Sequence, residues 1–276
     1  MINLGEKQLY LLLLLLTIVV GGCGNFSGNY EDFESSTSTE NTSTTSSTIK
    51  YLTVGGSGSV YSSTDGITWI ERISGISNSL NDVVYQNDVH MSVGESGTIV
   101  ESSDGISWVS RATGTSNKFS GVTYGNSLYV ALGDSGLIQT STPSTSWVTR
   151  TSGTTNNLIG AIYGNELYIA VGSSGIILTS SDGISWTSRT SGTTNQLSSG
   201  AYWNRYYMVV GVNGTILTST DGTSWTQRTS GSSSNLNEVI YGNGLYIVVG
   251  ASGTILTSSD GSSWTERTSG VTVNLN

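Results

Sequence analysis

The sequence predicts an all-β protein, a six-bladed β-propeller made of six 39-residue, four-stranded repeats. A tryptophan, and an arginine three residues after it, both recur every 39 residues without insertion or deletion. A period of this length is typical of propellers and solenoids. The repeats show no sustained 3.6-residue apolar period, so helices are not expected. The tryptophans are Trp69, Trp108, Trp147, Trp186, Trp225 and Trp264, and the arginines are Arg72, Arg111, Arg150, Arg189, Arg228 and Arg267.

The copy over residues 158–192 shows what one repeat contains. It has four short runs rich in apolar and β-branched residues, and Gly, Asn, Asp or Ser, which favour turns, separate them. Four strands of about five residues are the content of one propeller blade. The runs are Leu158–Tyr163, Leu167–Val171, Ile176–Ser180 and Ser185–Thr190.

A motif of the form Ser-Ser-Asp-Gly-Ile-Ser-Trp, seen at residues 180–186, connects the last two runs. We expect the Asp to accept hydrogen bonds from the backbone of its own turn, the Gly to take a positive φ, and the Trp to fold back onto the hairpin. These roles are structural. They apply to the six tryptophans and to Asp65, Asp104, Asp182, Asp221 and Asp260; the third repeat has Pro143 at this place.

These residues resemble the Asp-box (BNR) repeat found in sialidases, sortilin-type receptors and photosystem II assembly-factor-like propellers. The preceding Val-Gly-x-x-Gly-Thr-Ile-Leu-Thr-Ser, as in Val249–Ser258, resembles the last group most. The resemblance covers residues 49–270 and implies a propeller. It says little about function, because unrelated propellers share the repeat. In the usual box one residue separates Asp from Gly, whereas here they are adjacent, which implies a tighter turn.

The N-terminus, residues 1–22, is interpreted as the signal peptide of a bacterial lipoprotein. Its apolar core, Leu9–Val20, is too short to span a bilayer as a helix. Small residues precede Cys23, the one cysteine of the chain, as in a lipobox, so we expect lipidation of Cys23. An ordinary secretory signal with a chance cysteine is the alternative. Gly24 after the cysteine favours the outer membrane over the inner one in a Gram-negative cell envelope.

Residues 23–48 are predicted to be an acidic, Ser/Thr-rich flexible linker, and residues 49–276 the propeller. Counting back 39 residues places the inner strand of the first blade at Asn41–Ser46, which is poor in apolar residues. The other candidate for closing the ring is Val271–Leu275, which stops where a further inner strand would begin. An incompletely closed ring is the alternative to the closed propeller.

Charge limits the class of partner. The net charge of −9 opposes the binding of nucleic acid, and we expect a monomer. The six repeated arginines lie after the tryptophan on the outermost strand, so a structural role is expected for them rather than a sialic-acid site at the axis. His90 occupies the position of a tyrosine in the other repeats, which predicts a packing role.

The other carboxylates do not form a recognisable site. Asp82 and Glu238 share one position on inner strands, and Glu95 and Asp134 share a loop position. Solvated carboxylates are the expectation for all four, with a weak cation site as the alternative. No metal and no cofactor are expected.

The fifth repeat departs most from the others. It has Trp203, Arg205 and Tyr206 where the other copies have a Tyr-Gly-Asn-x-Leu-Tyr pattern, and these residue types are enriched at binding hot spots. Sequence drift in one copy is the competing explanation. We therefore predict a non-catalytic, lipid-anchored binding or scaffolding module of the cell envelope, with a protein or glycan partner. A glycan-active hydrolase of the sialidase kind and a membrane-complex assembly factor are the alternatives.

Overall fold

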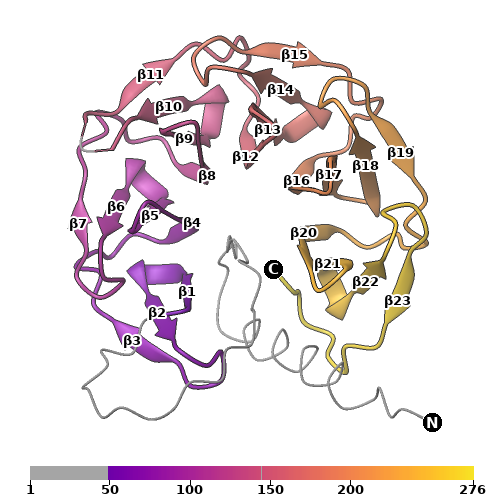
Figure 1. Ribbon diagram of the computed structural model, residues 1–276, viewed down its shortest axis with the longest axis horizontal. Coiled ribbons are helices and arrows are strands. Elements are labelled where there is room, and N and C mark those ends of the chain that lie inside the picture. The colour runs from indigo at the N-terminus through magenta and orange to yellow at the C-terminus, as the bar shows by residue number, and fades with distance from the viewer. Residues whose placement is uncertain (1–48, 144) are drawn as a thin grey trace, which may run out of the picture.

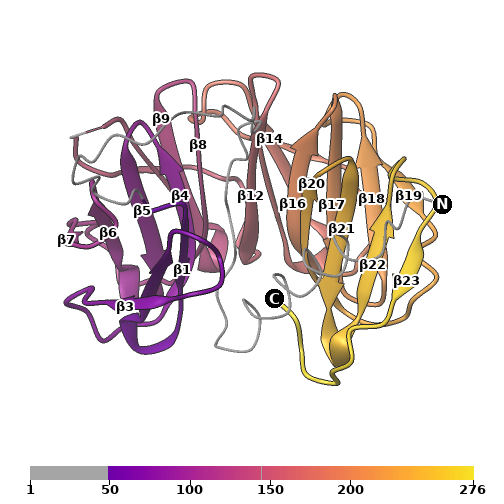
Figure 2. The same cartoon turned by 60° about the horizontal axis from the view of Figure 1, so that its bottom comes forward.

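The computed structural model describes residues 49–143 and 145–276, which form six antiparallel sheets arranged around a common axis (Figures 1 and 2). Five sheets have four strands whose order in space follows the chain, and the first sheet has three. The predicted all-β, six-bladed propeller is confirmed. The first and sixth sheets, at the two ends of the described chain, lie on either side of one opening in the ring of ribbons (Figure 1).

The strands of each blade run from the axis outward. Blade 1 consists of β1 (Tyr51–Val54), β2 (Val60–Ser63) and β3 (Ile70–Arg72). The inner, second, third and outer strands of the remaining blades are as follows: in blade 2, β4 (Leu80–Gln86), β5 (Val89–Gly94), β6 (Ile99–Ser102) and β7 (Val109–Ser110); in blade 3, β8 (Phe119–Gly125), β9 (Leu128–Gly133), β10 (Ile138–Ser141) and β11 (Val148–Arg150); in blade 4, β12 (Leu158–Gly164), β13 (Leu167–Gly172), β14 (Ile177–Ser180) and β15 (Thr187–Arg189); in blade 5, β16 (Leu197–Trp203), β17 (Tyr206–Gly211), β18 (Thr215–Ser219) and β19 (Thr226–Arg228); in blade 6, β20 (Leu236–Gly242), β21 (Leu245–Gly250), β22 (Ile255–Ser258) and β23 (Thr265–Arg267).

A tight turn between the second and third strands recurs around the ring. In blade 4 it is the one-turn 3-10 element η5 (Ser173–Gly175), with Ser174 at φ 57° and Gly175 at φ 69°. A Cβ on Gly175 would lie 2.0 Å from the carbonyl oxygen of Thr193, so this approach requires glycine. The equivalent elements are η2 (Gly56–Gly58), η3 (Glu95–Gly97), η4 (Asp134–Gly136) and η6 (Ala251–Gly253).

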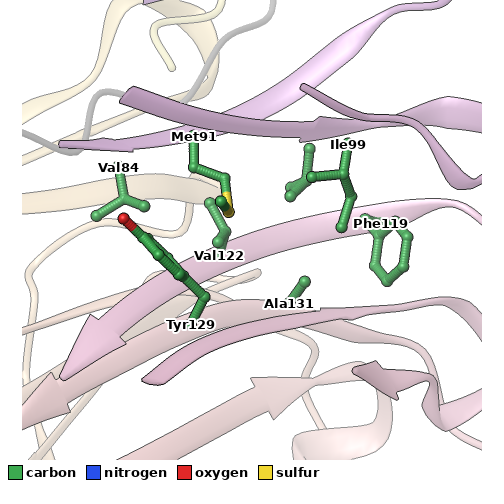
Figure 3. Close-up of a cluster of buried hydrophobic side chains, with 8 residues drawn as sticks. Val84, Met91, Ile99, Phe119, Val122, Tyr129 and Ala131 are labelled. Atoms are coloured by element: carbon green, nitrogen blue, oxygen red, sulfur yellow. The ribbon is translucent and has the colours of Figure 1, made fainter. Parts of the chain in front are cut away.

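The hydrophobic core lies between blades rather than within them. Figure 3 shows one such cluster, in which Met91 and Ile99 of blade 2 pack against Phe119 and Tyr129 of blade 3. Four more clusters of this kind join blades 1 to 2 and 3 through 6. Trp108, Trp147, Trp186, Trp225 and Trp264 each cover the outer edge of one cluster. Each blade is a single sheet that buries its faces only against the adjacent blades, so its stability depends on those neighbours.

The C-terminal segment packs on blade 6 and contains no strand. The Leu275 amide donates to the Gly250 carbonyl at 2.9 Å, as the Leu80 amide donates to Gly55 at 3.0 Å. Leu275 is 1% exposed and closes the apolar face of blade 6 around Ile247 and Val249. It therefore stands where the first residue of a further inner strand would stand. The other candidate for ring closure, Asn41–Ser46, lies outside the described residues.

Candidate functional site

The hairpin of blade 5 brings together the three residues that the sequence singles out. Trp203 ends β16, Tyr206 begins β17 and the two are directly paired across the hairpin. The turn between them consists of Asn204 at φ 48° and Arg205 at φ 67°. Two successive left-handed residues are the signature of a type I′ turn, whose twist matches that of the flanking strands. The arginine is therefore held at the tip of a rigid hairpin.

A comparison with the neighbouring blades explains why a tryptophan fits here. In blades 3 and 4 the matching residues are Gly125 and Gly164, and a Cβ on either would lie 2.2 Å from the tyrosine ring of the following blade. Trp203 fits because Tyr241 of blade 6 stacks on its indole instead, with 4.8 Å between ring centroids and 19° between planes. Tyr241 is a member of this site that the sequence analysis missed. The sequence held one indication of this contact. Trp203 stands where blades 3, 4 and 6 have glycine, and a large side chain at this position must meet the tyrosine of the following blade.

The resulting surface is apolar at its centre and basic at its tip. Trp203 is 43% exposed and Tyr206 is 42% exposed. The Tyr246 hydroxyl donates to the Trp203 carbonyl at 3.3 Å, which ties the end of β16 to blade 6. Arg205 forms no ion pair with any of the residues that the structure describes. We call Trp203, Arg205, Tyr206 and Tyr241 the aromatic platform.

Trp203 is partly covered rather than fully exposed. One face of the indole is covered by Tyr241, and such a pair contributes about 0.5–1.5 kcal/mol beyond its buried area. The other part of the ring remains accessible. A side chain that is already fixed loses little rotamer entropy when a partner covers it, which favours binding.

The Ser-Asp-Gly turns have the geometry expected of them. Asp182 Oδ1 accepts from the amides of Ile184 and Ser185, both at 2.8 Å, and from the Ser180 hydroxyl at 2.8 Å. These donors, the Ser185 amide foremost, lower the pKa of Asp182 to about 2. Trp186 Nε1 donates to the Gly183 carbonyl at 3.2 Å, so the tryptophan does fold back onto its hairpin. The same carboxylate bonds recur at Asp65, Asp104, Asp221 and Asp260.

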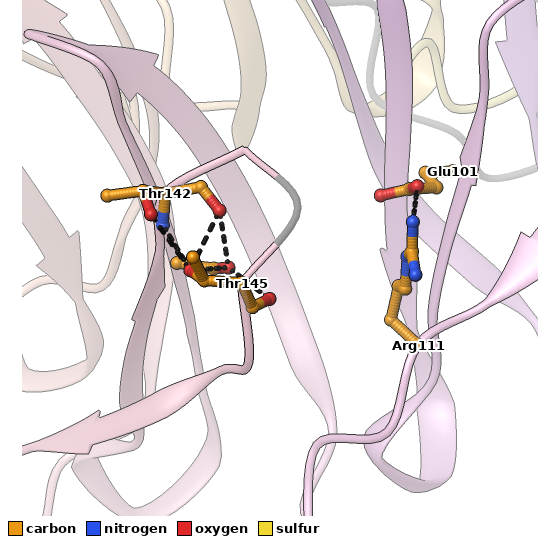
Figure 4. A network of polar contacts seen from close by, with 5 residues as sticks. Glu101, Arg111, Thr142 and Thr145 are labelled. Atoms are coloured by element: carbon orange, nitrogen blue, oxygen red, sulfur yellow. Dashed lines mark hydrogen bonds and ion pairs between the residues drawn. The ribbon is translucent and has the colours of Figure 1, made fainter.

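Blade 3 makes this turn without an aspartate. Thr145 Oγ1 accepts from the Thr142 amide at 3.1 Å, and the two hydroxyls lie 2.9 Å apart (Figure 4). The Ser141 hydroxyl donates to the Thr145 carbonyl at 2.9 Å. Hydroxyl groups therefore replace the carboxylate at this one position, where Pro143 stands.

The two inner-strand carboxylates correct the sequence-based expectation. Asp82 is 6% exposed, and its oxygens accept from the amides of Val83 and Val122, each at 2.8 Å. Burial, together with the charge of Glu238, raises the pKa of Asp82 to about 8. Glu238 accepts from the Ser199 hydroxyl and the Val239 amide, and burial raises its pKa to about 7. Both groups link adjacent blades near the axis. Asp82 is buried and Glu238 is partly buried, so neither is a freely solvated carboxylate.

The remaining candidates have structural surroundings. The His90 ring lies 4.4 Å from that of Tyr85, and burial lowers its pKa, as expected of a packing residue. Glu95 forms an ion pair with Lys118 at 3.1 Å. No three His, Cys, Asp or Glu side chains converge as a metal site requires anywhere in residues 49–143 and 145–276.

The N-terminal predictions concern another part of the chain. Cys23 and the signal segment lie outside the described residues. Within the part that the structure describes, no helix has the length and apolarity needed to cross a membrane.

These features define the class of the protein as a six-bladed β-propeller with an aromatic platform on one face. Among solved structures, YCF48 bound to D1 peptide is similar, with a TM-score of 0.62, 19% identity, and coverage of 78% of this chain and 76% of that chain. YCF48 from Cyanidioschyzon merolae has a TM-score of 0.61 and 17% identity, covering 78% and 80%. The computationally designed Ika8 protein has a TM-score of 0.59 and 10% identity, covering 79% and 74%. No protein-family model and no curated protein matches the chain.

Proposed function

We propose that this propeller, built from Asp-box repeats, is a non-catalytic, lipid-anchored binding module of the bacterial cell envelope. Its aromatic platform binds a protein partner. The observation that carries the proposal is the exposure of Trp203 and Tyr206 on one blade only, on a hairpin fixed by stacking. Tryptophan, tyrosine and arginine are the residue types that dominate binding energy at protein interfaces. The YCF48 structure with D1 peptide supports a protein partner, because that propeller of similar fold binds a peptide.

A specific role as an assembly factor of a membrane complex is the second candidate. The likeness in fold to YCF48 favours it. A sialidase-like activity has less support. The six arginines lie on or beside outer strands, and five of them bind a hydroxyl of the adjacent strand of their own blade through Nε at 2.8 Å. A glycan is the alternative partner for the platform.

The platform is tested by the double variant Trp203→Gly with Arg205→Ser, which introduces the residues of blade 3 at these two positions. Cross-linking of envelope extracts identifies the partner, and its affinity is then measured with purified protein. We expect the affinity to fall at least tenfold, about 1.4 kcal/mol. Tyr241 can move over the introduced glycine in the variant as Tyr163 lies over Gly125, so stability should change by no more than about 1 kcal/mol.

The matched control is Tyr85→Ala, which removes an exposed ring from the hairpin of blade 2 on the same face. This variant should keep the affinity of the unmodified protein. An unchanged affinity in the double variant, or an equal loss in Tyr85→Ala, would exclude the platform as the site.

The lipid anchor is tested separately with Cys23→Ser. The variant should move from the membrane fraction to the soluble fraction and lose its acyl mass, and the outer membrane is the expected location of the native protein. Native protein that is soluble and carries no acyl group would refute the anchor without touching the platform.

A further inference from the structure

Clefts recur at the outer edge of the face opposite the hairpins and the Asp-Gly turns. Each lies between the turn joining the second and third strands and the loop that follows the outer strand. The cleft of blade 3 has a volume of about 720 Å³, and that of blade 4 about 640 Å³. Both clefts are shallow and open to solvent, so they suit an extended ligand that lies along the surface. Arg150 lines the first and Arg189 the second.

Each of these two arginines is oriented by the blade and left with free donors. Nε donates at 2.8 Å to the hydroxyl of Thr140 in blade 3 and of Thr179 in blade 4. Neither guanidinium pairs with a carboxylate, and neither places an Nη atom in a hydrogen bond, within the described residues. A planar fork held in this way is suited to bind a carboxylate with two parallel hydrogen bonds.

The rest of the lining is hydroxyl groups and glycine. In blade 4, Ser174, Thr190 and Thr194 line the cleft, and none of their hydroxyls is used by another described residue. A Cβ on Gly192 would meet nothing within 4 Å, so the cleft is open above this residue. No aromatic side chain lines either cleft. The apolar pocket on which a protein hot spot depends is therefore missing here.

From these features we propose that the clefts of blades 3 and 4 bind the uronic-acid units of an acidic glycan. The sugar carboxylate would sit on the guanidinium, and its ring hydroxyls would exchange hydrogen bonds with the serine and threonine hydroxyls. This ligand site is separate from the aromatic platform and does not depend on it. Two equivalent clefts on adjacent blades allow one polymer to occupy both, which raises weak single-site affinity.

Two other blades show which features the site needs. In blade 2 the guanidinium of Arg111 is already paired with Glu101 (Figure 4). In blade 6 the cleft has a volume of about 510 Å³ and Glu266 lines it beside Arg267. A carboxylate ligand would meet a like charge in either place. Blades 3 and 4 have Thr149 and Ser188 at the position of Glu266, so their arginines face no such competitor.

The net charge of −9 repels an acidic glycan, and salt weakens this repulsion. Screening over about 8 Å at 0.15 M ionic strength removes the distant repulsion, whereas the contact with the arginine persists. Affinity for the acidic glycan should therefore be measurable at physiological salt.

The test is titration calorimetry of the full-length mature protein in detergent with tetragalacturonate, with neutral maltotetraose as the comparison ligand. Arg150→Gln with Arg189→Gln should weaken tetragalacturonate binding at least tenfold. Arg189→Lys, which keeps the charge but loses the fork, should weaken it severalfold and guards against a folding defect in the double variant. Arg111→Gln, whose guanidinium is already paired, should bind as the unmodified protein does.

Several outcomes would overturn the proposal. They are no binding of tetragalacturonate by the unmodified protein, equal binding of maltotetraose, tighter or equal binding of hexaglutamate, and full binding by the arginine double variant. The platform variant Trp203→Gly with Arg205→Ser should bind tetragalacturonate normally, so failure of one proposal leaves the other standing.

Discussion

The aspartates of the outer turns and the two carboxylates near the axis differ in how their charge is stabilised. Asp182 lies at the exposed rim and receives two backbone amides and a serine hydroxyl, which lower its pKa to about 2. Asp82 also receives two amides, but burial and the charge of Glu238 outweigh them and raise its pKa to about 8. Hydrogen bonds to the charged form and loss of solvent therefore compete at both places, and the depth of the site decides which prevails.

The comparison also separates repeated from single features. The outer turn recurs in five of the repeats with the same bonds, whereas Asp82 and Glu238 replace the Gly or Ser of the other inner strands. Repetition marks a role in every blade. A single replacement near the axis marks a local contact between two particular blades, here 2 with 3 and 5 with 6.

The largest effect is expected from the outer turn's tryptophan. Trp186→Ala removes a half-buried indole from the cluster between blades 3 and 4 and should lower the free energy of unfolding by about 2–3 kcal/mol. Urea denaturation measures this change. The control Ser188→Ala, at an exposed position of the following strand β15, should stay within about 0.5 kcal/mol. Equal stability of both variants would refute the structural role of the tryptophan.

The axial carboxylates should give a stability that falls as pH rises. Because the folded-state pKa of Glu238 is raised to about 7, the unfolded chain releases this proton first, and stability is lost between about pH 4.5 and 7. Gln can still accept from the Ser199 hydroxyl and the Val239 amide. Glu238→Gln should therefore be about 1–2 kcal/mol more stable than the unmodified protein at pH 8 and nearly equal at pH 4.

Thermal unfolding across this pH range measures the difference. The same melting temperature shift at pH 4 and pH 8 would show that the change acts through packing and not through ionisation.

The outer aspartate should show the opposite dependence on pH. Asp182→Ala should cost about 1 kcal/mol at neutral pH through the lost turn hydrogen bonds. The folded-state pKa is lowered to about 2, so this stability is present above about pH 4 and is lost as the pH falls through about 2. Unfolding by urea at pH 7 and at pH 2 checks this, and a difference that persists at pH 2 would contradict it.

The smallest effect is expected in blade 3. Pro143→Asp restores the residue of the other outer turns, but the Thr142 and Thr145 hydroxyls already provide the contacts of this turn. Stability should change by less than about 0.5 kcal/mol. A gain above about 1 kcal/mol in urea denaturation would mean that the hydroxyl network is a poor substitute for the carboxylate.

The aromatic platform shows how far the candidate site could be predicted. Trp203, Arg205 and Tyr206 stood out because each differs from its equivalents in a strict repeat. Their exposed fractions and the turn at Asn204 and Arg205 come from the structure. The stack with Tyr241 could not be predicted, because it depends on the spacing of neighbouring blades and not on the period of the chain.

By itself the sequence determined the number of blades, the order of their strands and the outer turns, because each is set by local turn chemistry and repeats every 39 residues. The tertiary structure decided which residues meet across blades. Asp82 is buried rather than solvated, Glu238 is partly buried, Tyr241 joins the platform, and Leu275 covers blade 6 at 1% exposure. The physical reason is that burial and ring stacking arise between segments about 40 residues apart in the chain, where side-chain contact depends on how one sheet packs against the next.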